Sequence, residues 1–440
     1  MLLGIVISIE IKMGDLYYII FFLCMLLGVQ VNGLSSLLSV LNRRECITNI
    51  IFGTSTLVPF VASNAASLED YNPESAETAK RFGRTYFPTL TPPFVNRATY
   101  RYSLGRNMWS LEQLLTFQNV TATVRTTVVK LVADDDDSLW VNSPQWPTGE
   151  FLHLLDELGT VKHVVLPCNA LEHKAPMKAF LQHYPQATVW ITPGQYGPFG
   201  SCSTAIDSKT TQSMGYRVDG ILPIGSLLNN NNNNKSEQPP WADEFDARTF
   251  YVSLPKNAGP VSEAAFYHKP TKTLITTDSV IYVPDQPPPI FQTYFQSNEA
   301  KDDLFWPKTV LQSIFLPLRQ AGDGTYPGYQ AIQGRLVRAP ILRAFTDARA
   351  PQEVKEWVKS IQEMGDFDRI VTSHFASPIK STPLEFANAF SYLNGPTNEP
   401  PIICKDWQLL DSLNSFIDDN DLGAPTIYDF KAGCPDTGSP

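Results

Sequence analysis

Hydrophobic and polar residues alternate from residue 124 onward in a way that predicts a layered protein. The stretches 124–131 and 138–142 are rich in β-branched residues and flank a short acidic turn, which is typical of a β-hairpin. Thr148 then precedes an amphipathic stretch at 149–158, and Gly159 follows it. A threonine before the first turn and a glycine after the last are the usual ends of a helix. The pattern therefore predicts two strands followed by a capped helix.

The same alternation of strands and helices continues along the chain. A buried strand at 162–167, a helix at 175–183 and a strand at 187–192 follow in turn. Strands that alternate with helices indicate an α/β fold in which helices cover the sheets. Further downstream the pattern predicts strands at 250–254, 264–268, 273–277 and 369–372, and helices at 352–365 and 383–393.

Several segments interrupt or flank this pattern and define the expected domain organisation. Residues 67–108 are polar and form a predicted N-terminal arm. The stretch 229–240 contains an asparagine tract and predicts a disordered surface loop. Residues 284–334 are rich in Pro, Phe and Tyr and form a predicted excursion over the domain. One domain is therefore expected at 109–395, followed by a C-terminal extension at 396–440.

Residues 1–66 have the features of a targeting region. The apolar run 17–31 has the length of a signal-peptide core and is shorter than the roughly 20 residues of a membrane-spanning helix. A second apolar stretch, 47–62, follows a pair of arginines and ends near Ala65 with small residues. This tandem resembles the bipartite presequences of plastid proteins in algae with complex plastids, which implies a plastid and a thylakoid-lumen destination. Secretion is the alternative, and no membrane span is expected after processing.

Composition limits the possible partners. The chain has 440 residues, of which 43% are hydrophobic and 18% charged, with a net charge of -10. Such a chain can bury a full core. Nucleic-acid binding is disfavoured because it needs clustered basic residues. The wide spacing of Cys168, Cys202, Cys404 and Cys434 favours free thiols, and a Cys404–Cys434 disulfide stays open.

A metal-binding motif is partly present directly after the strand at 162–167. The sequence there is Cys-Asn-Ala-Leu-Glu-His, from Cys168 to His173. It resembles the H-x-H-x-D-H motif of the metallo-β-lactamase-like family, which follows a strand at the same place in the fold. Glu172 and His173 match the D-H end of the motif, while Cys168 and Ala170 stand at the positions of its two earlier histidines.

Two later strand ends extend this resemblance. The stretch Leu-Ile-Thr-Thr-Asp that ends at Asp278 resembles the family strand that ends in the metal-bridging aspartate. His374 follows the strand at 369–372, and it matches the family's terminal histidine. The family's P-G-H turn has no histidine here, so that ligand is lost or replaced by Asn257.

The resemblance is closer still to a domain-of-unknown-function branch of this superfamily, found in cyanobacteria and plastids. The stretches 139–144, 159–169 and 184–187 carry it. This likeness implies an αβ/βα four-layer sandwich over about residues 109–395. It does not imply a particular reaction.

The surviving family ligands are His173, Asp278, His374 and Glu172, of which Glu172 fits least well because its side chain is one methylene longer. In the family these positions build the second metal site. They predict a site for one Zn²⁺, Fe²⁺ or Mn²⁺ ion, which would support hydrolysis of an ester, thioester or similar small substrate. Each residue taken alone could have a purely structural role, and a degenerate site would hold no metal.

The leading functional hypothesis is therefore a plastid-targeted metallo-hydrolase-like protein. The alternative is a catalytically inactive binding or assembly module, with a protein partner contacted by aromatic residues of the excursion at 284–334. The absence of both first-site histidines favours this alternative, and it argues against a di-iron oxidoreductase.

Overall fold

A computed structural model describes most of the chain from Ala98 onward. The predictions for the targeting region 1–66, for most of the arm and for the asparagine tract lie outside the described residues. The structure describes residues 98–117, 120–132, 137–195, 214–227, 238–254, 259–294, 304–395, 402–421, 423–431 and 433–434.

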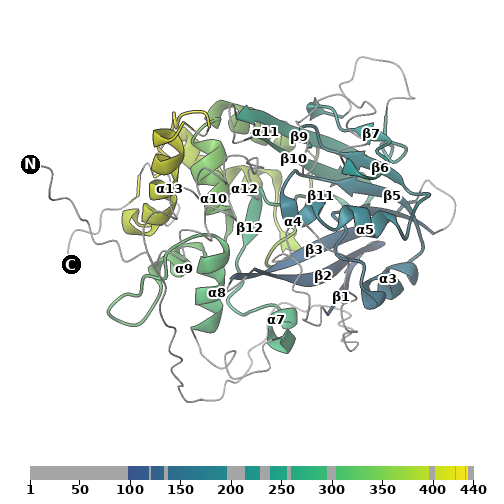
Figure 1. Cartoon of the computed structure of the whole chain (residues 1–440), viewed down its shortest axis with the longest axis horizontal. Coiled ribbons are helices and arrows are strands. Elements are labelled where there is room, and N and C mark those ends of the chain that lie inside the picture. The colour runs from purple at the N-terminus through teal and green to yellow at the C-terminus, as the bar shows by residue number, and fades with distance from the viewer. Residues whose placement is uncertain are drawn as a thin grey trace, which may run out of the picture.

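The first half of the fold is a mixed seven-stranded sheet (Figure 1). Its first four strands pair antiparallel, and the last four pair in parallel. The antiparallel pairing of the third and fourth strands confirms the predicted hairpin. In spatial order the strands are β1 (Tyr100–Gly105), β2 (Met108–Phe117), β3 (Val120–Lys130), β4 (Ser138–Asn142), β5 (Thr160–Leu166), β6 (Thr188–Ile191) and β7 (Gly220–Ile221).

The second half contains a six-stranded sheet and a small two-stranded sheet. In the larger sheet, β11 and β14 lie side by side in parallel, so the turns that follow them leave the same edge. Its spatial order is β15 (Ile379–Lys380), β14 (Arg369–Val371), β11 (Thr273–Ile275), β10 (Gly259–His268), β9 (Phe245–Leu254) and β8 (Gly225–Ser226). The small sheet pairs β12 (Val280–Tyr282) with β13 (Leu336–Arg338).

Side-chain alternation along the strands separates three hydrophobic clusters and creates four layers. In β4, Leu139 and Val141 face one cluster, and Trp140 between them faces another. The cluster that contains Trp140 also holds Phe266 of β10, so it fills the space between the two sheets. Successive strand residues point to opposite faces of a sheet, so both large sheets are buried on two sides. The predicted αβ/βα sandwich is confirmed.

Helices close both outer faces of the sandwich. Helix α3 (Gly149–Asp156) begins at the predicted cap, where Thr148 Oγ1 accepts a hydrogen bond from the Phe151 amide at 3.1 Å. Together with α5 (Met177–Leu181) it covers the first sheet. Helices α11 (Pro351–Gln362) and α12 (Pro383–Asn388) lie in the cluster on the outer face of the second sheet.

The predicted helix at 175–183 is not one continuous helix with its expected bounds in the structure. It is replaced by two short helices, α4 (Leu171–Lys174) and α5, with Pro176 at the start of the second one. Proline lacks an amide hydrogen and is tolerated in the first turn of a helix but not in its interior. The break places Glu172 and His173 on a separate turn of helix directly after β5.

The predicted boundary at residue 108 between the N-terminal arm and the domain lies too late in the chain. Strand β1 lies inside that range, and Tyr100, Tyr102 and Leu104 are buried. Their period-two spacing is the pattern of a strand, but it is short and lies next to a polar stretch. The chain therefore enters the first sheet before residue 109.

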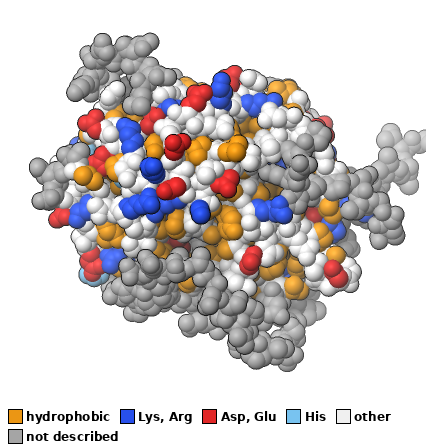
Figure 2. Space-filling view, turned by 180° about the vertical axis from the view of Figure 1, so that it is seen from behind, with side chains coloured by type: hydrophobic (Ala, Val, Ile, Leu, Met, Phe, Trp, Pro, Cys, Tyr) orange, Lys and Arg blue, Asp and Glu red, His pale blue; other side chains and the backbone are white. Residues whose placement is uncertain are grey.

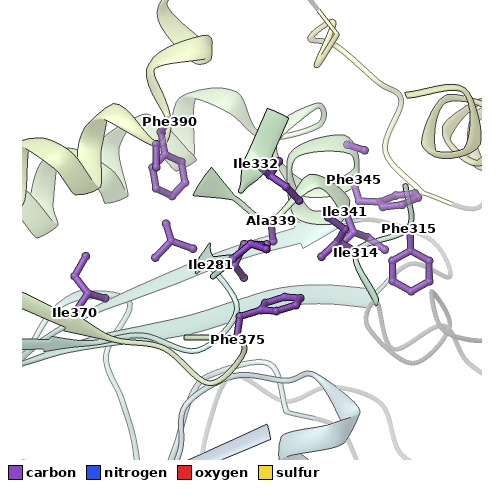
Figure 3. Close-up of a cluster of buried hydrophobic side chains, with 14 of the residues drawn as sticks. Ile281, Ile314, Phe315, Ile332, Ala339, Ile341, Phe345, Ile370, Phe375 and Phe390 are labelled. Carbon is purple, nitrogen blue, oxygen red and sulfur yellow. The ribbon is translucent and has the colours of Figure 1, made fainter. Parts of the chain in front are cut away.

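The predicted excursion and the C-terminal extension both pack onto the second sheet. The predicted excursion contains α7 (Pro289–Tyr294), α8 (Phe305–Ser313) and α9 (Pro327–Ile332), and α10 (Pro340–Leu342) follows it. Ile314, Phe315 and Ile332 of this region pack in one buried cluster with Ile370 of β14 (Figure 3). The C-terminal helix α13 (Gln408–Asp419) joins the same cluster through Leu410.

Cys404 and Cys434 form a disulfide, which corrects the expectation of free thiols. Helix α13 lies between them and returns the chain toward Cys404, so their Cα atoms are 5.1 Å apart. The sequence separation of 30 residues between the two cysteines does not by itself indicate that they pair. Cys168 is a free and buried thiol.

Within the described residues, no helix combines the length and apolar character that crossing a membrane requires. On the face shown in Figure 2, basic and acidic side chains are interspersed with hydrophobic ones. Charge of either sign is therefore spread over this face.

Candidate metal centre

Four side chains predicted from the sequence as ligands meet at the edges of the two large sheets. Glu172 and His173 lie on α4 after β5, Asp278 follows β11, and His374 follows β14. One potential ligand atom from each of the four lies within 4.8 Å of the others. Strand ends far apart in the sequence are thus brought together, and the role of these residues as metal ligands stays a prediction.

Asp278 lies at the centre of this group. Its Oδ1 atom is 3.2 Å from His173 Nε2 and 2.9 Å from His374 Nε2. His173 is fully buried, while the side chains of Asp278 and His374 keep 14% and 15% of their surface exposed. The two imidazoles therefore converge on one carboxylate oxygen in a largely buried group.

The two imidazoles determine the charge state of this carboxylate. Burial alone would raise the pKa of Asp278, but the charges and hydrogen bonds of His173 and His374 outweigh burial and hold the pKa far below its usual range. Burial lowers the pKa of His374, and Asp278 more than compensates, so the pKa is raised overall. Asp278 is therefore an anion throughout the neutral range.

The Nδ1 atom of each imidazole also has a hydrogen-bond partner. His374 Nδ1 lies 2.6 Å from the Thr123 carbonyl oxygen of β3, and His173 Nδ1 is hydrogen-bonded to Ser143 Oγ at the end of β4. A carbonyl can only accept, so His374 Nδ1 carries a proton and donates it. The hydrogen bond from Nε2 to the Asp278 carboxylate needs a second proton on the ring, and loss of that proton frees the Nε2 lone pair. Partners of this kind fix the tautomer and orientation of metal-binding histidines.

Asp278 is held in place by its backbone. The Glu263 Oε1 atom of β10 accepts hydrogen bonds from the amides of Thr277, Asp278 and Ser279, at 2.8, 3.1 and 3.2 Å. Glu263 is buried, and a carboxylate that accepts several amide hydrogen bonds is a strong local anchor. The turn after β11 is therefore fixed from the neighbouring strand.

Glu172 and Cys168 occupy the remaining sides of the group. Burial, followed by the charge of Asp278, raises the pKa of Glu172, so this carboxyl holds a proton more readily than an exposed one. Cys168 Sγ lies 3.6 Å from Asp278 Oδ2, the oxygen that faces away from the imidazoles. Burial and the nearby carboxylates of Asp278 and Glu263 raise the pKa of the Cys168 thiol. This agrees with the expectation of an inert thiol.

The donor set fits a metal ion. Tetrahedral ligands bound to zinc at about 2.0–2.1 Å are separated from one another by roughly 3.3 Å. The two separations between imidazole nitrogens and the Asp278 oxygen, 3.2 and 2.9 Å, are close to this spacing. Small outward movements would open the position for an ion between them. His173, Asp278 and His374 could therefore hold a cation, with a Glu172 oxygen within 4.8 Å of their donor atoms.

Replacement of Ser143 by Ala is expected to weaken zinc binding about 10-fold or more, the usual effect of losing a partner of a metal-binding histidine. The variant leaves the buried His173 Nδ1 without its hydroxyl partner, so the ring is oriented less strictly. Isothermal titration of the purified chain with Zn²⁺ measures the change. Ser412→Ala, on the exposed side of α13, is the control, and an equal effect of both changes would contradict the role of Ser143.

Several supporting residues were not identified from the sequence. Ser143, Thr123 and Glu263 contact the predicted ligands from neighbouring strands, and only Glu263 carries a signal, as an isolated acidic residue in an otherwise uncharged strand. The candidate replacement ligand Asn257 lies outside the described residues. His268, which is not among the predicted ligands, is paired with Glu244.

A family model described as a domain of unknown function (DUF4336) matches residues 106–309 and 322–392. No curated protein matches the chain.

Two of the similar solved structures come from bacteria. A metallo-β-lactamase from Pontibacter korlensis is 10% identical, with 68% of this chain and 99% of that chain covered and a TM-score of 0.32. A metal-soaked Flv1 flavodiiron core from Synechocystis sp. PCC6803 is also 10% identical, with coverages of 75% and 71% and a TM-score of 0.40. At such identities the similarity concerns the fold alone.

Proposed function

Because the chain belongs to the family described as a domain of unknown function (DUF4336), and because its fold is a metallo-β-lactamase-like sandwich, we propose that it is a metallo-hydrolase with a mononuclear site. His173, Asp278 and His374 would hold the ion, and Glu172 would lie beside it. One observation supports this most directly: the Nε2 atoms of both histidines lie within 3.2 Å of the same Asp278 oxygen.

Zn²⁺, Fe²⁺ and Mn²⁺ are the ions that suit a set of two imidazoles and carboxylates. When bound, such an ion supplies Lewis acidity, which activates water and polarises a carbonyl group. Thr123 and Ser143 keep both imidazoles oriented, and Glu263 keeps Asp278 in place. Glu172 is buried beside the three proposed ligands, with a carboxyl oxygen within 4.8 Å of their donor atoms.

We propose an ester, thioester or similar small molecule as the substrate, in a plastid and in the thylakoid lumen in particular. The substrate proposal rests on the single-ion chemistry, which suits hydrolysis of an activated acyl group. The location rests on the tandem apolar stretches within residues 1–66.

A second candidate is a catalytically inactive binding module. Cys168 and Ala170 occupy the positions of the first-site histidines, and both are buried, which favours this alternative. The excursion supports it less well than the sequence suggested, because Phe291, Trp306 and Tyr329 are buried within the domain. These aromatic side chains stabilise the fold and are not exposed to a partner.

The test is the metal content of the full chain, purified without chelators or a histidine tag. We expect about one zinc per chain after incubation with Zn²⁺ and dialysis, measured by mass spectrometry. Turnover of p-nitrophenyl esters or acyl thioesters by the zinc-loaded chain would support the hydrolase. Zinc binding without turnover would favour the binding module, and absence of zinc at neutral pH would overturn the mononuclear site.

A further inference from the structure

The turn that carries His374 is held by two residues of the opposite sheet. His374 follows β14 of the second sheet, whereas Thr123 and Arg125 belong to β3 of the first. Residues two apart on a strand point to the same face. Val129, farther along β3 on this face, lies in the cluster between the sheets, so Thr123 and Arg125 also point toward the second sheet.

Thr123 contacts two consecutive residues of this turn. Its carbonyl oxygen accepts from His374 Nδ1 at 2.6 Å, and its Oγ1 accepts from the Phe375 amide at 2.9 Å. Thr123 therefore orients the imidazole and holds the backbone immediately after it.

Arg125 holds the backbone on both sides of His374. Its Nη1 donates to the Thr372 carbonyl oxygen, and its Nη2 donates to the Phe375 carbonyl oxygen at 2.7 Å. Only 1% of the Arg125 side chain is exposed. A planar guanidinium can make such contacts in several directions at once, which an ammonium group cannot.

Glu112 compensates the buried charge of Arg125. It lies directly opposite Arg125 in the β2–β3 pair, and its Oε1 accepts from Arg125 Nε at 2.8 Å. Nε and Nη2 thus face Glu112, while Nη1 and Nη2 also donate to the turn. A buried arginine needs partners of this kind.

The backbone of the turn would not adopt its shape unaided. Phe375 has a φ of 55°, in the left-handed region that residues with a Cβ rarely adopt. Its ring is buried in the cluster shown in Figure 3, close to Ile281. The contacts from β3 and the buried ring together stabilise a conformation that directs His374 toward Asp278.

We infer that Arg125 is a positioning residue for the metal ligand His374, acting through the backbone at Thr372 and Phe375. This inference rests on the proposed metal site and deepens it, because it assigns the orientation of one ligand to the opposite sheet. Arg125 itself does not touch the ion.

The test compares Arg125→Lys with Arg349→Lys in the full chain. Lysine keeps the charge beside Glu112 but cannot reach both carbonyl groups. Arg349 is a matched control because its side chain is also buried and donates to the Ala424 and Phe345 carbonyl oxygens, near the C-terminus. Competition with a chelator gives the Zn²⁺ affinity, which should fall about 10- to 100-fold in Arg125→Lys and stay within about two-fold in Arg349→Lys.

A second measurement distinguishes this inference from the proposed metal site. In the metal-free chain, nuclear magnetic resonance should show a hydrogen-bonded His374 Nδ1 proton that shifts in Arg125→Lys and not in Arg349→Lys. If the unsubstituted chain binds no zinc, the proposed function is wrong. The resonance of the His374 Nδ1 proton then tests the role of Arg125 by itself. An unchanged proton resonance, or an equal loss of zinc affinity in both variants, would overturn it. If Arg125→Lys does not fold, Arg125→Met combined with Glu112→Leu serves instead, because it removes the donors to Thr372 and Phe375 together with the opposing buried charge.

Discussion

Replacement of either His173 or His374 by Ala is expected to lower zinc affinity more than about 100-fold, so that dialysed protein retains no stoichiometric metal. Each change removes one imidazole from a set of donor atoms that lie within 4.8 Å of one another. A metal site loses most of its binding free energy when a ligand is absent, since the remaining groups cannot complete the coordination. Zinc content by mass spectrometry and competition with a chelator measure the loss.

The chain provides two control histidines for this experiment. His153 on α3 and His183 after α5 are exposed and lie outside the metal-binding group. Their replacement by Ala should leave zinc content unchanged. A full equivalent of zinc in His374→Ala would show that the ion is bound elsewhere.

Replacement of Arg338 by Met is expected to destabilise the protein by about 3–5 kcal/mol, the usual cost of leaving a buried charge unpaired. Arg338 Nε and Nη2 donate to both oxygens of Asp347 at 3.0 and 2.8 Å, and the two side chains are only 5% and 0% exposed. The Tyr392 hydroxyl also donates to Asp347. Without Arg338, the Asp347 carboxylate would keep this one donor and no opposing charge. Urea denaturation of the metal-free chain gives the free energy of unfolding.

Two further variants separate the buried charge from other effects of the change. Arg338→Met combined with Asp347→Leu should recover much of the lost stability, because it removes both charges together. Arg217→Met breaks an ion pair with Asp219 whose arginine is 54% exposed, and it should cost about 0–1 kcal/mol. A loss below about 1 kcal/mol in Arg338→Met alone would contradict the assigned role of this pair.

The Arg338–Asp347 ion pair also lies close to the candidate metal centre. Arg338 Nη1 donates to the Ser279 carbonyl oxygen at 3.0 Å, one residue after Asp278. The amide of the same Ser279 donates to Glu263. The turn that carries Asp278 is therefore held from two sides, by a strand of the second sheet and by the small β12–β13 sheet. We expect Arg338→Met to loosen this turn as well as to destabilise the fold.

The amino-acid sequence by itself determined much of the strand and helix pattern. Short β-branched stretches predicted β3, β4 and β5, and the Thr148 cap predicted the start of α3, because these signals depend on residues that are neighbours in the chain. The candidate ligands His173, Asp278 and His374 were also accessible from the sequence, because each directly follows a strand and matches a family motif.

Only the tertiary structure decided which residues support that site. Thr123, Arg125 and Glu263 contact turns that follow other strands, and the Cys404–Cys434 pairing depends on the return of the chain after α13. Each of these contacts joins segments that are distant in the chain, so no local pattern of hydrophobic and polar residues records it. The sequence determines local conformation through nearby side chains, whereas the position of the ligands depends on how the two sheets pack against each other.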